Sequence, residues 1–511
     1  MKDVTRLSLL VISTVLSITY SATAQDSGKL TQLSFEEALR LVRENSHVLK
    51  QSDYLHKEKE QEMRAAKGLY LPKVGIAASY MVMSDDLTLD LTPVRDAITP
   101  LYSALGNFGD FSGIPNPDPN TSQQMPILPD DVSTQIMRQK LKEGLATVQE
   151  GEWNKMIQEK QFGTVMANFQ WPIYAGGKIQ AANKAAAIQL TDAGQKTHQK
   201  EDEIMSELVE RYYGLCLAQQ AILVRQEVYN GMEKHLQDAI KMQDEGLIAN
   251  ADVLHARVFH SQAERELSKA KRTGQILNQA LLNTIAVDDT VNIQTGSQLF
   301  YLDSIEDVAW FQMQARSQNP LLQQVESKRL LSEQAHKAEK ADYFPTIAAQ
   351  GMYDIVNKDL SPYAPEWTLG IGMKWTLFDG ASRYRKITAA AYKTDQVREA
   401  GFKAGNDIQT MINKSYQELE MYREQIGQLA SAREFAEEYV RVTEKAFHEE
   451  MANSTEVVDA RLALCQVRIE RLQAIYGYDL ALANILQYAG ISDQFPLYAR
   501  RPGVITESYQ K

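Results

Sequence analysis

Four segments of the chain alternate between apolar and polar residues, the pattern of a β-strand with one apolar face. The clearest is residues 368–380, where Leu369, Ile371 and Met373 alternate with Gly370, Gly372 and Lys374. The others are residues 72–83, 164–176 and 345–357. Each has about the 9 to 11 residues that a tilted membrane strand needs. Lys374 turned to lipid would cost about 2 to 4 kcal/mol, so we expect it to face a lumen.

Two much longer segments, residues 177–245 and 381–449, contain no proline and are rich in Ala, Gln, Glu and Lys. At 1.5 Å per residue each predicts a helix of about 100 Å, too long for a single globular core. Such a helix needs a partner along its length, and we predict return helices over 251–287 and 454–490. Gly246 is placed to end the first long helix with a positive φ, and Asn250 or Ser454 to cap the return helices.

The second return helix has the 3-4 spacing of a coiled-coil seam. The seam positions are Leu462, Cys465, Ile469, Leu472 and Tyr476. We therefore expect Cys465, and likewise Cys216 between two leucines, to be core residues. Shorter helices are predicted over 35–69 and 308–341, the second broken at Asn319-Pro320.

The chain repeats itself at an offset of 204 residues. Residues 163–287 align without a gap to 367–491, and Trp171 meets Trp375. We interpret this as a domain duplication, because solenoid repeats are only about 20 to 50 residues long. The expected division is a first repeat over 25–287, an equatorial linker over 288–303, a second repeat over 304–491 and a tail over 492–511. The first repeat carries an insertion over 84–163.

The N-terminus and the composition narrow the class of protein. Residues 1–24 have the basic start, apolar run and Ala-Thr-Ala end of a secretory signal peptide. The 511 residues carry a net charge of -12, which excludes a general basic surface for nucleic acid. Two distant cysteines exclude a disulfide framework, and the eight histidines have no metal-ligand spacing. Without a catalytic motif we expect no enzyme, no cofactor and no metal.

The predicted fold class is mixed α and β, mostly α. Long antiparallel coiled-coil helices are joined to four membrane strands, which contribute to a β-barrel. Four strands cannot close a barrel, since the smallest bacterial barrels have about eight, so at least two copies are needed and three would give 12 strands. The alternative is a secreted trimeric coiled-coil structural or adhesin protein with a soluble β head.

Three repeated motifs carry a family resemblance. They are Tyr70-Leu71-Pro72 with Tyr343-Phe344-Pro345 before strands, Trp171 and Trp375 five residues before Gly176 and Gly380, and Gly246-Leu247 before Asp252-Val253-Leu254. With the signal peptide and the duplication, the chain resembles the TolC-like outer-membrane efflux protein family.

The resemblance implies a homotrimer in outer-membrane lipid, with a 12-stranded β-barrel and an α-barrel of long helices that forms a large periplasmic tunnel. It also implies the exit duct of a tripartite efflux or type I secretion system. Its partners would be a periplasmic adaptor protein and an inner-membrane transporter of the RND or ABC class.

The resemblance also implies site residues. Gly246 and Leu247 would dock the adaptor, although a helix C-cap explains them equally. Glu456 and Asp459 would ring the tunnel entrance and attract cations, although acids are favoured in a first helical turn by the helix dipole alone. Asp252 occupies the position of an entrance lock that some relatives build with tyrosine and arginine. This chain has Phe447 and Ala452 there, so that lock is in doubt.

The insertion over 84–163 lies between two predicted membrane strands and is expected to be extracellular. It contains the proline-rich stretch 115–120. Its acids Asp85, Asp86, Asp130 and Asp131 have no regular calcium-ligand spacing, which favours solvated loop charge.

Overall fold

The computed structural model describes residues 30–108, 114, 131–287, 291–449 and 451–509. The predicted signal peptide, residues 115–120 and Asp130 lie outside the described residues. The chain forms two units. The helical unit comprises Met1–Glu62, Ala186–Glu333 and Tyr392–Lys511, and the strand unit comprises Met63–Ala185 and Gln334–Ala391.

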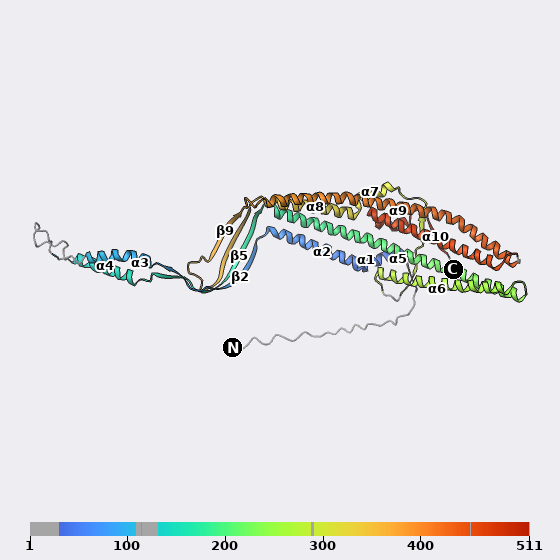
Figure 1. The fold of residues 1–511 in the computed structure, drawn as a ribbon, viewed down its shortest axis with the longest axis horizontal. Helices are drawn as coiled ribbons and strands as arrows, with labels where there is room; N and C mark the ends of the chain where they lie inside the picture. Colours follow the sequence, from blue (N-terminus) through green and yellow to red (C-terminus); the bar gives the residue numbers. More distant parts are fainter. Residues whose placement is uncertain (1–29, 109–113, 115–130, 288–290, 450, 510–511) are drawn as a thin grey trace, which may run out of the picture. The chain divides into compact units, whose positions relative to one another are not determined.

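Two long helices and two return helices dominate the fold (Figure 1). The long helices are α5 (Lys178–Asp244) and α9 (Ser382–His448), each 67 residues. The return helices are α6 (Asn250–Ile285) and α10 (Ser454–Ala489), each 36 residues. At 1.5 Å per residue the long helices extend about 100 Å. The sequence predicted their bounds as 177–245, 381–449, 251–287 and 454–490.

Shorter helices precede each half. They are α1 (Phe35–Asn45), α2 (His47–Lys67), α7 (Val308–Gln318) and α8 (Pro320–Ala341). The break between α7 and α8 falls at Asn319-Pro320, as predicted. Asn319 stabilises it by donating from Nδ2 to the carbonyl oxygen of Tyr488, 2.8 Å away. The sequence predicted one helix over 35–69, which was wrong, because the chain also breaks at Ser46.

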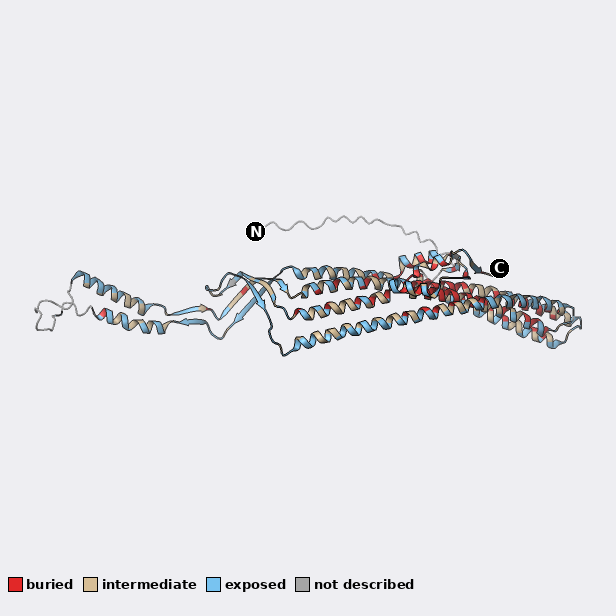
Figure 2. Cartoon of the chain, turned by 90° about the horizontal axis from the view of Figure 1, so that it is seen from above, coloured by how far each residue is buried: buried red, intermediate tan, exposed pale blue. Residues whose placement is uncertain are grey.

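The core of the helical unit is aromatic and lies between α1, α5, α10 and two small sheets. Strand β1 (Leu30–Leu33) pairs in parallel with β6 (Asn292–Thr295), and β7 (Leu299–Leu302) pairs antiparallel with β10 (Val504–Glu507). Phe35, Tyr212, Tyr213, Phe300 and Phe495 are all buried, with neighbouring ring centroids 5.4 to 5.9 Å apart. Helix α11 (Phe495–Tyr498) closes the cluster near the C-terminus. Buried residues concentrate in this unit (Figure 2).

Both cysteines are core residues, as predicted. Cys216 and Cys465 are unpaired and buried. Burial raises the pKa of Cys216 to about 11, and its thiol donates to the carbonyl oxygen of Ser297. A thiol with so high a pKa is protonated at neutral pH and is therefore a poor nucleophile.

The strand unit contains one antiparallel sheet in the order β2-β5-β8-β9. Its strands are β2 (Lys73–Val82), β5 (Gln161–Ala175), β8 (Thr346–Lys358) and β9 (Trp367–Lys374). Strand β9 ends six residues before the predicted limit at residue 380. Trp171 and Trp375 make equivalent contacts, since each indole Nε1 donates to the carbonyl oxygen of the tyrosine in a Tyr-x-Pro motif, Tyr70 and Tyr343.

The register of the sheet collects the apolar positions of all four strands on one face. Ile76 lies opposite Ala167, which lies opposite Tyr353, which in turn lies opposite Trp367. The other face is polar, because Gln170 lies opposite both Lys73 and Gln350. Lys374 lies opposite Thr346 on this polar face. The apolar face is uncovered in the single chain, where Ile76 and Ile371 are 72% and 73% exposed.

The described part of the insertion over 84–163 is largely helical. Strands β3 (Leu87–Asp90) and β4 (Asn154–Gln158) pair at its base, and they lead into α3 (Thr92–Phe108) and α4 (Val132–Glu150). Asp131 is the N-cap of α4 and accepts from the backbone N–H of Thr134, and Asp86 accepts from that of Lys160. These two acids therefore have local structural roles.

The buried residue Asp479 provides a test of whether a carboxyl group in this core is protonated at neutral pH. It is completely buried on α10, and neither carboxylate oxygen has a hydrogen-bond partner among the described residues. Burial raises its pKa well above the ordinary carboxyl range. A raised folded-state pKa contributes stability at acidic pH that is lost as the pH rises from the unfolded-state value through the folded-state value. We expect Asp479→Asn to melt at a higher temperature than wild type, with an advantage that grows between pH 5 and pH 8.

The slope of that advantage has an upper limit of about 1.4 kcal/mol per pH unit. Thermal melting at several pH values measures it. Asp407→Asn is the control, because Asp407 is exposed and already paired with Lys403 at 2.5 Å. A pH-independent difference for Asp479→Asn would show that Asp479 ionises normally.

Candidate functional site at the hairpin tips

The first hairpin tip is built by Gly246 and Leu247. Helix α5 ends at Asp244, and Gly246 has a φ of 75°, a left-handed conformation that favours glycine. The backbone N–H of Leu247 then donates to the carbonyl oxygen of Met242 at 2.8 Å, which satisfies an end group of the helix. Gly246 is exposed and the Leu247 side chain is 48% exposed. Gly246 and Leu247 therefore cap the end of α5, and Leu247 is also an accessible apolar residue at the tip.

The return helices are capped one residue earlier than predicted. Asn250 and Ser454 are first helical residues, and the N-caps are Ala249 and Asn453. Asn453 accepts from the backbone N–H of Glu456 at 3.0 Å, whereas Ala249 has no side-chain acceptor. At the start of α6 the Asp252 carboxylate accepts a hydrogen bond from the backbone N–H of Ala249 at 3.2 Å, which satisfies that N–H group.

The three predicted entrance acids lie at these caps. Glu456 and Asp459 are both exposed, three residues apart on α10. Glu456 accepts from Asn453 Nδ2 at 3.2 Å and is therefore held at the helix start. Asp252 is half-buried on α6. Asp252, Glu456 and Leu247 together line a cavity of about 420 Å³ between the two tips, whereas Asp459 and Gly246 are not part of its lining.

A contact between the hairpins lies beside this cavity and was not predicted from the sequence. His235 on α5 is 5% exposed and shares a hydrogen bond of 2.8 Å with the Ser454 hydroxyl through Nε2. Its ring packs on Phe447 of α9, with centroids 4.8 Å apart. Phe447, which replaces a tyrosine of the expected lock, is thus a buried packing residue. Residues 219 positions apart give no local signal of such a contact.

Arg461 supports the same contact. Its guanidinium forms an ion pair with Glu444 of α9 and lies so close to Gly231 of α5 that a Cβ atom there would collide with it. Burial, followed by the charge of Arg461, lowers the pKa of His235 to about 4. His235 is therefore neutral at neutral pH. Arg257, the aligned arginine of the first repeat, is exposed instead.

None of the described helices has a stretch long and apolar enough to cross a membrane. Within the same residues no group of three or more His, Cys, Asp or Glu side chains is placed to hold a metal ion.

Comparisons with solved structures identify the fold. The crystal structure of the outer membrane protein VceC of Vibrio cholerae matches with a TM-score of 0.65 at 13% identity, covering 89% of this chain and 96% of that one. The CmeC outer membrane channel of Campylobacter jejuni matches with a TM-score of 0.64 at 12% identity, covering 90% and 86%. The fold is therefore that of outer-membrane channels.

Sequence comparison adds the family. The outer membrane efflux protein family matches residues 312–491. Protein CyaE of Bordetella pertussis is 24% identical over 226 residues, which are 43% of this chain and 48% of CyaE, so the match spans about half of that relative. The resemblance to TolC-like outer-membrane efflux proteins is confirmed, and the predicted outer-membrane location with a helical periplasmic part agrees with it.

The His235 contact predicts pH-dependent loosening of the tips. A histidine whose folded-state pKa is lowered contributes stability above its unfolded-state pKa, and that stability is lost as the pH falls toward the folded-state value. From pH 7 to pH 5 we expect the free energy of local opening to fall by about 1 to 2 kcal/mol, and His235→Gln to remove this dependence.

Hydrogen exchange of peptides covering residues 230–260 and 440–465, corrected for intrinsic rates, measures this opening free energy. His448→Gln is the matched control, since His448 lies at the same tip but is exposed. If the free energy of opening fell equally in wild type and His235→Gln, the pH dependence would not come from His235.

Proposed function

We propose that the protein is the outer-membrane exit duct of a tripartite efflux or type I secretion system. In this proposal substrate passes from an inner-membrane transporter and a periplasmic adaptor, through the duct, to the outside. The efflux-family match over 312–491 and the channel fold support it.

The uncovered apolar face of the four-stranded sheet carries the proposal. Large apolar side chains of the outer strands, Val74, Ile76, Leu369 and Ile371, are each at least 70% exposed in the single chain. An apolar patch of this kind on ordered strands marks a surface that is covered in the functional state. The polar residues on the opposite face favour lipid on one side and water on the other.

The open edges of the sheet favour a trimer. Strands β2 and β9 each pair on one side only within the described sheet. Unpaired backbone groups cannot remain in lipid, so β2 of one copy must pair with β9 of the next. Three copies give a closed barrel of 12 strands, and the helices of the three copies enclose the periplasmic tunnel.

The two tips provide the working surfaces of the duct. We assign adaptor docking to Gly246 and Leu247, because Leu247 is the exposed apolar residue of its turn. We assign cation attraction at the entrance to Glu456 and Asp459, which are exposed on one face of α10 and are repeated three times in the trimer.

Fractionation tests the function. We expect the mature protein in outer membranes, as a heat-modifiable oligomer that dissociates to single chains on boiling. Because the sheet edges pair between copies, Ile76→Pro in β2 should abolish the oligomer, whereas Pro at the exposed tip residue Leu247 should leave it intact. Recovery of wild type from the soluble periplasm would instead favour the trimeric coiled-coil structural protein.

Conductance tests the entrance ring. In planar bilayers we expect Glu456→Gln with Asp459→Asn to reduce the preference for potassium over chloride several-fold, because up to six carboxylates leave one ring. The reversal potential across a salt gradient measures the preference. Glu449→Gln is the control, since this tip carboxylate is already near Lys445 at 3.8 Å. An unchanged reversal potential in the double variant would remove the ring from the proposal.

A further inference from the structure

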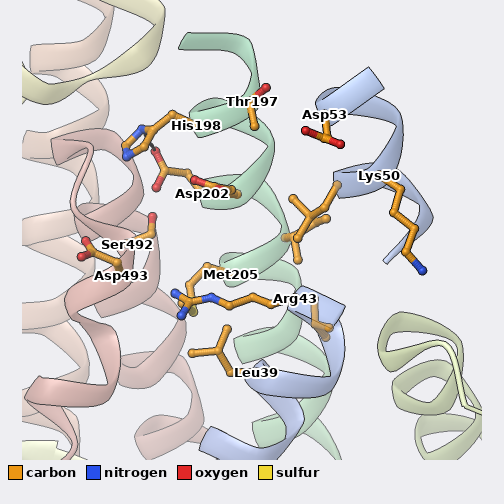
Figure 3. Close-up of a pocket in the computed structure, with 14 residues that line it drawn as sticks. Leu39, Arg43, Lys50, Asp53, Thr197, His198, Asp202, Met205, Ser492 and Asp493 are labelled. Carbon is orange, nitrogen blue, oxygen red and sulfur yellow. Dashed lines mark ion pairs between the residues drawn. The ribbon is translucent and has the colours of Figure 1, made fainter. Parts of the chain in front are cut away.

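A second cavity in the helical unit contains a buried acid whose ionic partner, His198, is half-exposed. The cavity has a volume of about 510 Å³ and lies between α1, α2, α5 and the start of the C-terminal tail. Asp202 of α5 lines it and is 5% exposed, and its Oδ2 atom has no hydrogen-bond partner among the described residues. Ser492 of the tail is 2% exposed, and its hydroxyl is likewise unpartnered in the described part of the chain. Figure 3 shows both side chains at one end of the cavity.

The charged neighbours do not neutralise Asp202. The nearest cation is His198 Nδ1, 3.6 Å from Asp202 Oδ2, on a side chain that is 48% exposed. Lys50 points away and donates to the carbonyl oxygen of Asn45 at 3.3 Å. Arg43 lines the cavity but forms no ion pair with any described residue. Glu201 and Asp493 add further negative charge near Asp202.

The rest of the lining is apolar. It is formed by Leu39, Val42, Leu49, Ile204 and Met205. An isolated buried carboxylate is unfavourable unless it is paired, so the cavity favours a ligand that brings a positive charge to Asp202. The apolar wall favours a hydrocarbon chain attached to that charge, and the volume is that of a small-molecule site.

We propose that this cavity is a binding site for a primary alkylammonium group, with Asp202 as its counter-ion, Ser492 as a hydrogen-bond acceptor and the apolar wall around its chain. The group belongs to a free alkylamine or to a lysine side chain of a second copy. This site is separate from the hairpin tips, and the proposal does not depend on the protein being an exit duct.

The pH dependence of binding follows from the acid. Burial raises the pKa of Asp202 to about 6, against the opposing effect of His198. The titratable and charged groups that line the cavity around it are Arg43 from α1, Lys50 and Asp53 from α2, His198 and Glu201 from α5, and Asp493 from the tail. Only ionised Asp202 attracts a cation, so affinity should fall about tenfold from pH 8 to pH 5, where an alkylamine remains protonated.

Calorimetric titration of the full chain in detergent with n-pentylamine tests the proposal. We expect one saturable site per chain, at least tenfold weaker binding of the uncharged analogue n-pentanol, and at least tenfold weaker pentylamine binding to Asp202→Asn. Asp407→Asn is the control, because Asp407 is exposed, pairs with Lys403 at 2.5 Å and is not part of the cavity lining. It should bind within about twofold of wild type. Asp202→Asn removes a buried charge and is expected to fold, which its melting temperature at pH 8 checks.

The state of the oligomer distinguishes the two sources of the ammonium group. If pentylamine binds without changing the oligomer on a semi-native gel, the natural ligand is a free amine. If pentylamine dissociates the oligomer and Asp202→Asn weakens it, the site holds a lysine of a second copy. The proposal would be overturned if pentylamine did not bind to wild type, or if it bound equally well to wild type and Asp202→Asn.

Discussion

A helix of about 100 Å cannot be stabilised by one compact core, and this constraint organises the rest of the chain. The 67 residues of α5 need partners along their whole length. Near its middle, Leu208, Tyr212 and Leu215 are completely or almost completely buried in the aromatic core. Toward the tip the return helix α6 takes over, where Ala239 packs with Val253 and Ala256. The short helices, the small sheets and the C-terminal tail therefore pack on segments of the long helices that a hairpin partner alone would leave exposed to solvent.

The elements that could be predicted from the sequence are those with a local signal. Long proline-free runs, alternating strands and the break at Asn319 are local signals, and each gave an element at nearly its observed position. The break at Ser46 was missed because neither proline nor glycine marks it. The caps were misplaced by one residue, since the predicted caps Asn250 and Ser454 are the first helical residues and the N-caps are Ala249 and Asn453. The contacts of His235 and the setting of Asp202 depend on residues more than 200 positions away. No local pattern encodes them.

The two hairpin tips differ chemically although they have similar turns. Both tips expose an apolar residue, Leu247 or Met451, but the first turns at Gly246, whereas the second has the asparagine N-cap Asn453. His235 joins the first hairpin to the second through its hydrogen bond to Ser454, and Arg461, which pairs with Glu444 inside the second hairpin, lies against Gly231 of the first. Because His235 is kept neutral by burial, the hydrogen bond to Ser454 persists at neutral pH without opposing charges. The tips are thus held together by buried groups, which leaves the exposed carboxylates free for solvent and ions.

Asp202 and Asp479 illustrate how the surroundings of a buried acid determine its role. Both lie in the helical unit, and burial raises the pKa of each. Asp479 is completely buried, so no ligand can reach it and protonation is the favourable state. Asp202 borders a cavity and has a pKa of about 6, so it is mostly ionised at neutral pH. A carboxylate in that state lowers its free energy by pairing with a cation, and the open volume beside it makes pairing possible. Access, more than the depth of burial, therefore separates an acid that belongs to the core from one that can bind a ligand.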